Sequence, residues 1–112
     1  MSNPHPALTK QSAAIAELCR RFGVLRLEAF GSAASGAFRE GQSDFDFLIE
    51  LDPSAPGSRA MRLIDFAEAL EALLGAPVDL VNPRYIRNSY FSAEMAKTRR
   101  PIYERPASEA VV

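Results

Sequence analysis

The chain has 112 residues, a length typical of one domain built around a single hydrophobic core. Hydrophobic residues make up 47% of it and charged residues 24%, as in soluble globular proteins and unlike disordered ones. The formal net charge of -1 excludes a general electrostatic attraction to nucleic acid. The single cysteine, Cys19, excludes an internal disulfide, and its place on the apolar side of a predicted helix favours a core role over a nucleophilic one.

No apolar run approaches the ~20 residues of a membrane span, and the N-terminus lacks the pattern of a signal peptide. We therefore expect a cytoplasmic protein that makes no membrane contact. A single domain is expected over residues 1–112, with flexible ends at about 1–6 and 105–112.

The first part of the chain predicts a helix, a strand and a small polar loop. From Ala7 to Phe22 apolar residues recur at helical spacing, and Gly23 follows as a stop. Val24–Phe30 then alternates in the manner of a strand. Gly31–Ser43 is rich in glycine, serine and alanine, which predicts a turn and a short helix.

The second part begins with the strongest predicted strand, Phe45–Leu51, whose Phe, Ile and Leu residues share one face. A helix is expected from Ser58, its cap, to Leu74, where Gly75 ends it. A short strand, a helix and an edge strand follow, at Val78–Val81, Arg84–Arg99 and Pro101–Glu104. This order predicts an α/β protein of the α+β type, in which helices pack on a small mixed sheet of about three or four strands.

Two polar motifs flank the predicted loop. Gly31 and Ser32 end the first strand, and a glycine there lets the backbone turn sharply and approach a ligand closely. Backbone N–H groups at such a turn, together with the Ser32 hydroxyl, favour phosphate oxygens. Most Gly-Ser pairs, however, are plain turns, so this motif alone is weak.

Three aspartates are the candidate metal ligands. Asp44 and Asp46 are two residues apart at the start of a strand, so their carboxylates project to the same side and repel each other. A bound cation would relieve this repulsion, and carboxylates with water and phosphate are the ligands that Mg²⁺ prefers. Asp79 lies within a short apolar strand and can join them if the two strands are neighbours. The alternative interpretation is that all three simply face water.

The Gly-Ser pair and the three aspartates together are a more specific signal than either motif alone. Gly31-Ser32-Ala33 is followed after ten residues by Asp44-Phe45-Asp46, and Asp79 comes later. This pattern resembles the minimal nucleotidyltransferases of the DNA polymerase beta superfamily, and within them the MntA-type antitoxins that are paired with HEPN-domain toxins. The resemblance extends from Ala7 to Glu104 in motif and in element order, and it implies the polymerase-beta-like nucleotidyltransferase fold.

The resemblance also implies roles for these residues. Gly31 and Ser32 would hold the triphosphate of ATP or another nucleoside triphosphate, and Asp44 and Asp46 would bind Mg²⁺. Asp79 would be the third carboxylate, which activates the acceptor hydroxyl and contacts a second metal ion.

One departure concerns Ser35, which stands where members of the family often carry an arginine. Ser35 is therefore expected to contribute a hydrogen bond to the nucleotide but no charge. Arg39, Arg59 and Arg62 are the candidates to replace that charge.

The expected function is Mg²⁺-dependent transfer of a nucleoside monophosphate, AMP from ATP, to a hydroxyl of a partner protein. The expected partner is a HEPN-domain toxin, for which this chain would be the antitoxin. The alternative is an antitoxin of little or no catalytic activity that neutralises its toxin by binding alone. Transfer to a small molecule such as an aminoglycoside is disfavoured, since those enzymes usually carry a further helical domain.

Basic residues gather towards the C-terminal part of the chain. We interpret them as a solvated helix face, next as a surface for an acidic partner, and last as an RNA-binding site; they are Arg84, Arg87, Lys97, Arg99 and Arg100. Nucleic acid is therefore not an expected partner. His5, the only histidine, lies in the N-terminal segment and is not a catalytic candidate.

Overall fold

A computed structural model describes residues 4–82, 93 and 97–106. Its elements in chain order are α1 (Pro6–Lys10), α2 (Ser12–Phe22), β1 (Val24–Phe30), α3 (Ser32–Ser35), β2 (Phe45–Leu51), α4 (Arg59–Leu74), β3 (Val78–Val81) and β4 (Arg100–Glu104). The four strands form one sheet in the order β3-β2-β1-β4. β1 is antiparallel to β2 and to β4, whereas β2 and β3 are parallel. The mixed sheet with packed helices that the sequence predicted is confirmed.

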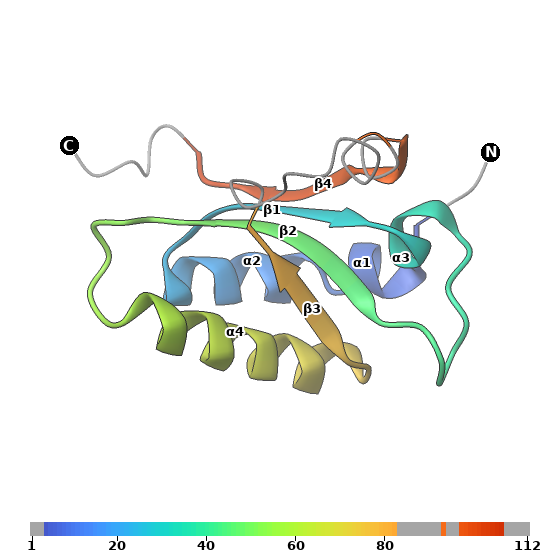
Figure 1. Cartoon of the computed structure of the whole chain (residues 1–112), viewed down its shortest axis with the longest axis horizontal. Helices are drawn as coiled ribbons and strands as arrows, with labels where there is room; N and C mark the ends of the chain where they lie inside the picture. The colour runs from blue at the N-terminus through green and yellow to red at the C-terminus, as the bar shows by residue number, and fades with distance from the viewer. Residues whose placement is uncertain (1–3, 83–92, 94–96, 107–112) are drawn as a thin grey trace.

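The main core lies between the sheet and the long helices α2 and α4, which cover one of its faces (Figure 1). Its largest fully buried side chains are Phe45, Phe47, Phe66, Ile15, Leu27, Leu70, Val24 and Cys19. Burial raises the pKa of the Cys19 thiol to about 12, so the thiol stays protonated and the predicted core role is confirmed. A smaller cluster, Phe30 and Leu48 with Val81 against it, lies apart from this core.

The alternation in β2 and the caps of α4 were predicted correctly. In β2, Phe45, Phe47, Ile49 and Leu51 all pack in the main core. Ser58 caps α4 by accepting a hydrogen bond from the backbone N–H of Met61 at 3.4 Å, and Gly75 ends it in the left-handed conformation. Between β2 and β3, α4 provides the crossover that two parallel strands require.

The N-terminal helix differs from the prediction in two respects. The expected single helix is divided at Gln11 into α1 and α2. His5, assigned to a flexible end, makes defined contacts instead. Its Nδ1 accepts a hydrogen bond from the backbone N–H of Ala7. The centre of its ring lies 4.6 Å from the ring centre of Phe38 and 5.0 Å from that of Phe45. Arg105, assigned to the other flexible end, pairs with Asp52 at 2.8 Å.

Most of the helix predicted for Arg84–Arg99 lies outside the described residues. Within the described part, Thr98 is helical and Arg99 is not, so this helix ends one residue earlier than predicted. No helix in the described part of the chain is long and apolar enough to cross a membrane.

Arg62 joins α4 to the end of the sheet that lies away from α3. Its guanidinium donates to the backbone carbonyls of Phe22, at 3.3 Å, and Asp52, at 3.1 Å. It thus ties the C-terminal end of α2 and the loop after β2 to α4.

We expect Arg62→Met to lower the free energy of unfolding by about 1–3 kcal/mol, because it leaves two part-buried carbonyls without their charged donor. Urea denaturation would measure the change. The control is Arg59→Met on the first turn of the same helix, where the side chain is exposed and we expect a change within about 0.5 kcal/mol. Equal effects of the two substitutions would contradict a specific role for the Arg62 contacts.

Candidate active site

The predicted carboxylates lie at the edge of the sheet nearest α3. In the strand register Asp46 lies opposite Phe30 of β1 and opposite Asp79 of β3. The residues that flank these aspartates pack in the main core, so both carboxylates project from the other face of the sheet. Asp46 and Asp79 therefore stand side by side on neighbouring strands, on the same face as the cluster of Phe30 and Leu48.

The surroundings of Asp46 disfavour the ionised form of its carboxylate. Its pKa is raised to about 6 by burial first, then by the negative charges of Asp79 and Asp44. Asp79 and Asp44 are thus close enough to act on Asp46, which is also the most buried of the three. Positive charge from a metal ion would lower the pKa of Asp46 and stabilise the ionised cluster.

Gly31 brings the loop backbone into contact with this carboxylate. Its backbone has φ 70 and ψ -149, a combination almost restricted to glycine. A Cβ at this position would lie 2.8 Å from Oδ2 of Asp46, which is closer than two such atoms can come. The close approach that Gly31 makes in the structure is to Asp46, whereas its predicted approach to a ligand stays a prediction.

Asp44 and Asp79 are both exposed, Asp44 just before β2 and Asp79 on the edge strand β3. The alternative interpretation, that they face water, agrees with their exposure. Among the described residues, no group of three or more His, Cys, Asp or Glu side chains has the geometry of a metal site. The donor set still suits Mg²⁺, which is commonly held by one or two carboxylates together with substrate phosphates and water.

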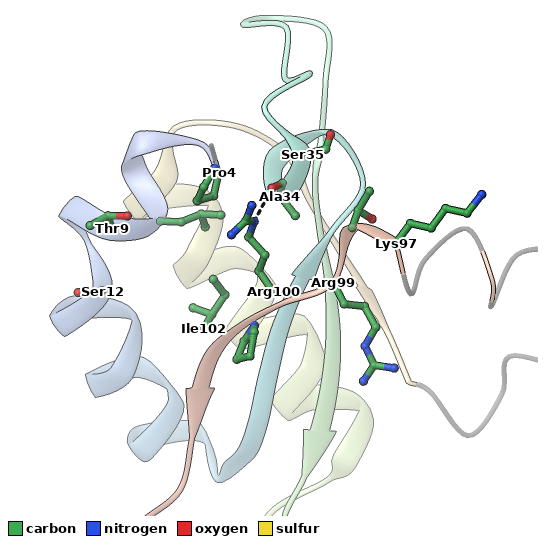
Figure 2. Close-up of a pocket in the computed structure, with 12 residues that line it drawn as sticks. Pro4, Thr9, Ser12, Ala34, Ser35, Lys97, Arg99, Arg100 and Ile102 are labelled. Atoms are coloured by element: carbon green, nitrogen blue, oxygen red, sulfur yellow. Dashed lines mark hydrogen bonds between the residues drawn. The ribbon is translucent and has the colours of Figure 1, made fainter. Parts of the chain in front are cut away.

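Ser32 and Ser35 stand at opposite ends of α3, and the structure places them differently. Ser32 follows Gly31 directly and is the first residue of α3. Ser35 instead lines a cavity of about 620 Å³ between α1, α3 and the start of β4 (Figure 2). None of the three aspartates lines this cavity. The role expected for Ser35 in nucleotide binding stays a prediction.

The three arginines named as replacements for the missing charge lie elsewhere. Arg62 is bound to carbonyls at the far end of the sheet, and Arg59 lies near Pro53 and Glu50. Arg39 is exposed in the loop that precedes β2. A cation that does contact α3 is Arg100, whose Nε donates to the carbonyl oxygen of Ala34 at 2.9 Å (Figure 2).

A set of contacts around the Gly31 loop was not predicted from the sequence. Thr98 Oγ1 accepts a hydrogen bond from the Gly31 N–H at 3.0 Å. Arg99 donates from Nε and Nη2 to the two carboxylate oxygens of Glu28, at 2.9 and 2.8 Å. The interpretation of the basic C-terminal residues as a solvated helix face is therefore wrong for Arg99 and for Arg100, which lies in β4. The one available signal was Glu28, an acidic residue in a strand whose other members are apolar apart from Arg26.

Comparison with known proteins agrees with this arrangement. A family model described as the nucleotidyltransferase domain matches residues 12–103. Protein adenylyltransferase MntA of Thermococcus cleftensis is 43% identical over 67 residues, which are 58% of this chain and 62% of that protein. The chain therefore matches less than two thirds of the length of this relative.

Two solved structures share the fold. The structure of a protein assigned as a minimal nucleotidyltransferase has a TM-score of 0.67 and 31% identity, covering 84% of this chain and 91% of that one. A chain from the complex of tri-AMPylated Shewanella oneidensis HEPN toxin with MNT antitoxin has a TM-score of 0.56 and 16% identity, covering 88% of this chain and 73% of that one. Because the family model spans most of the sequence, this chain belongs to the nucleotidyltransferase domain family.

Proposed function

We propose that this chain transfers AMP from Mg²⁺-bound ATP to a hydroxyl of a HEPN-domain toxin and thereby acts as its antitoxin. The observation that carries the proposal is the meeting of Gly31, Asp46 and Asp79 at one edge of the sheet. The adenylyltransferase relative and the fold shared with a complex of an AMPylated HEPN toxin support the choice of AMP and of acceptor.

The metal ligands in this proposal are Asp44 and Asp46, with Asp79 on the side of the acceptor. When bound, Mg²⁺ would neutralise the triphosphate and the developing charge on the leaving pyrophosphate. The raised pKa of Asp46 supports this assignment, because a carboxylate held ionised beside two others has most to gain from a cation.

The chain itself would position the reactants. The turn at Gly31 and the hydroxyl of Ser32 would hold the phosphates against the carboxylates. The acceptor oxygen would attack the α-phosphorus of ATP, forming the new P–O bond as the bond to the β-phosphate oxygen breaks and pyrophosphate leaves. Asp79 would take the proton of the acceptor hydroxyl, and its exposure suits contact with a partner docked on the surface.

With Mg²⁺-ATP, the purified protein is expected to add AMP to its cognate HEPN toxin. Intact-mass spectrometry of the toxin would show the addition, and omission of Mg²⁺ should prevent it. The Asp44→Asn/Asp46→Asn double variant is the control, since it retains the side-chain shapes but loses both charges. A toxin of unchanged mass after incubation with the wild-type protein would contradict the proposal.

The second candidate function is an antitoxin that acts by binding alone. It is favoured by Ser35, which supplies no charge at the position where members of the family often carry an arginine. Growth of cells that express the toxin together with the Asp44→Asn/Asp46→Asn variant separates the two functions. Protection that survives in this variant supports neutralisation by binding, whereas lost protection by a folded variant supports catalysis.

A further inference from the structure

Three consecutive residues, Thr98, Arg99 and Arg100, form what we call the Thr98–Arg100 segment, which contacts the Gly31–Ser35 loop, made of Gly31 and α3. Thr98 Oγ1 accepts a hydrogen bond from the Gly31 N–H, and Arg100 Nε donates one to the carbonyl oxygen of Ala34. Figure 2 shows Arg100 reaching towards α3, whereas Arg99 extends away from it. The loop is thus held near both of its ends by a segment more than sixty residues later in the chain, with separations of 67 and 66 residues.

The Glu28–Arg99 pair anchors this segment to the sheet. The Glu28 residue is only 7% exposed, and the guanidinium of Arg99 binds both oxygens of its carboxylate. Such two-pronged pairs fix the mutual orientation of their partners as well as adding energy. The hydrogen bonds from Arg99 lower the pKa of Glu28 against the opposing effect of burial, and Arg26 lies 3.6 Å from the same carboxylate. Glu28 therefore stays ionised, and the pair persists at neutral pH.

The hydrogen bond from Gly31 to Thr98 has a consequence for the site. A glycine can adopt several backbone conformations, so a hydrogen-bond partner helps to fix the direction of its N–H. Here the Thr98 hydroxyl supplies that partner while the Gly31 Cα packs against the Asp46 carboxylate. The position of the loop relative to Asp46 therefore depends on the hydrogen bond to Thr98, which lies two residues before β4.

We propose that Thr98 and Arg99 are positioning residues that set the Gly31–Ser35 loop for the triphosphate. The inference rests on the proposed function, because it concerns how the same site receives its nucleotide. Neither residue needs to touch the nucleotide: Thr98 acts through Gly31, and Arg99 acts through Glu28 by fixing the start of β4.

The test uses Thr98→Val, which keeps the shape of the side chain but loses the acceptor oxygen, and Thr98→Ser, which restores it. Two quantities are measured on the full chain. One is hydrogen exchange at the Gly31 amide, followed by NMR without nucleotide. The other is the Kd of the ATP analogue AMP-PNP with Mg²⁺, measured by titration calorimetry.

In Thr98→Val we expect Gly31 exchange to accelerate and the Kd to rise about tenfold, the effect of one hydrogen bond. Thr98→Ser should restore both quantities. Arg99→Lys, which keeps the charge but loses the two-pronged contact with Glu28, should also raise the Kd. The matched control is Thr9→Val, a threonine that lines the same cavity from α1, and we expect it to bind like the wild type.

A merely structural role for Thr98 would lower the melting temperature of Thr98→Val and leave its Kd, measured well below melting, unchanged. If the wild type binds Mg²⁺–AMP-PNP and Thr98→Val gives this result, the inference is overturned but the proposed function is not. A wild-type chain with a protected Gly31 amide but no affinity for Mg²⁺–AMP-PNP overturns the proposed function, and the inference with it.

Discussion

Replacing Asp46 with asparagine is expected to reduce AMP transfer about 1,000-fold or more and, at the same time, to stabilise the metal-free protein. The loss of activity follows because the substitution removes the central metal ligand of the proposed site, and a metal ion supplies several kcal/mol of transition-state stabilisation. The gain in stability follows because the wild-type carboxylate is ionised in a part-buried position beside Asp79 and Asp44.

The expected difference in the free energy of unfolding between Asp46→Asn and the wild type depends on pH. The pKa of Asp46 rises from 3.8 to about 6 on folding, so the folded state binds more protons than the unfolded state within that interval. The free energy of unfolding of the metal-free wild type therefore falls as the pH rises through it, and Asp46→Asn lacks this decrease. Above pH 6 we expect the variant to be more stable by about 1 kcal/mol, a value reduced for solvent screening of a part-exposed group.

Urea denaturation in EDTA at several pH values would measure the difference, and Asp65→Asn on the exposed side of α4 is the control for loss of one negative charge. Saturating Mg²⁺–AMP-PNP should reverse the order, because a ligand stabilises only the protein that binds it. A variant that is less stable than the wild type in EDTA, or that still transfers AMP at the wild-type rate, would contradict the role given to Asp46.

The elements with strong local signals were predicted to within a residue. Phe45–Leu51 alternates strictly, and α4 has both a serine cap and a terminal glycine, so each carries its own boundaries in the sequence. The division at Gln11 was not predictable in this way. Helical spacing continues across it, whereas the hydrogen bond from the His5 N–H to the Ala33 carbonyl oxygen, at 2.7 Å, joins residues that are distant in the sequence.

The candidate site also combines features that have a local sequence signal with features that have none. Gly31, Asp44 and Asp46 are close in sequence, so their meeting follows from one loop and the start of one strand. The place of Asp79 depends on β3 pairing with β2, which a single β-α-β crossover makes the simplest topology. The contact between Glu28 and Arg99 joins a residue of β1 to the residue just before β4, 71 positions later, and the pairing of these two strands has no local signal. Sequence patterns specify elements and neighbouring motifs, whereas these side-chain partners are decided by packing.

Gly31→Ala is expected to lower AMP transfer about 100-fold, because displacement of the loop by about 1 Å would misplace the phosphates against the carboxylates. It combines two unfavourable effects. The backbone at φ 70 and ψ -149 strains any residue with a Cβ, and that Cβ would lie 2.8 Å from Asp46 Oδ2. We expect the free energy of unfolding to fall by about 1–3 kcal/mol. The control is Gly75→Ala at φ 73, where nothing lies within 4 Å of the added Cβ and transfer should remain unchanged.

A double-mutant cycle with Asp46→Ala separates the two effects of Gly31→Ala. Truncation of Asp46 removes the oxygen that the new Cβ would meet, so only the backbone strain remains in that background. We therefore expect Gly31→Ala to destabilise the Asp46→Ala protein less than it destabilises the wild type, with a coupling of about 0.5–3 kcal/mol measured by urea denaturation. If the two losses were equal, Gly31 and Asp46 would not be in contact in solution, and the glycine would be required for its backbone conformation alone.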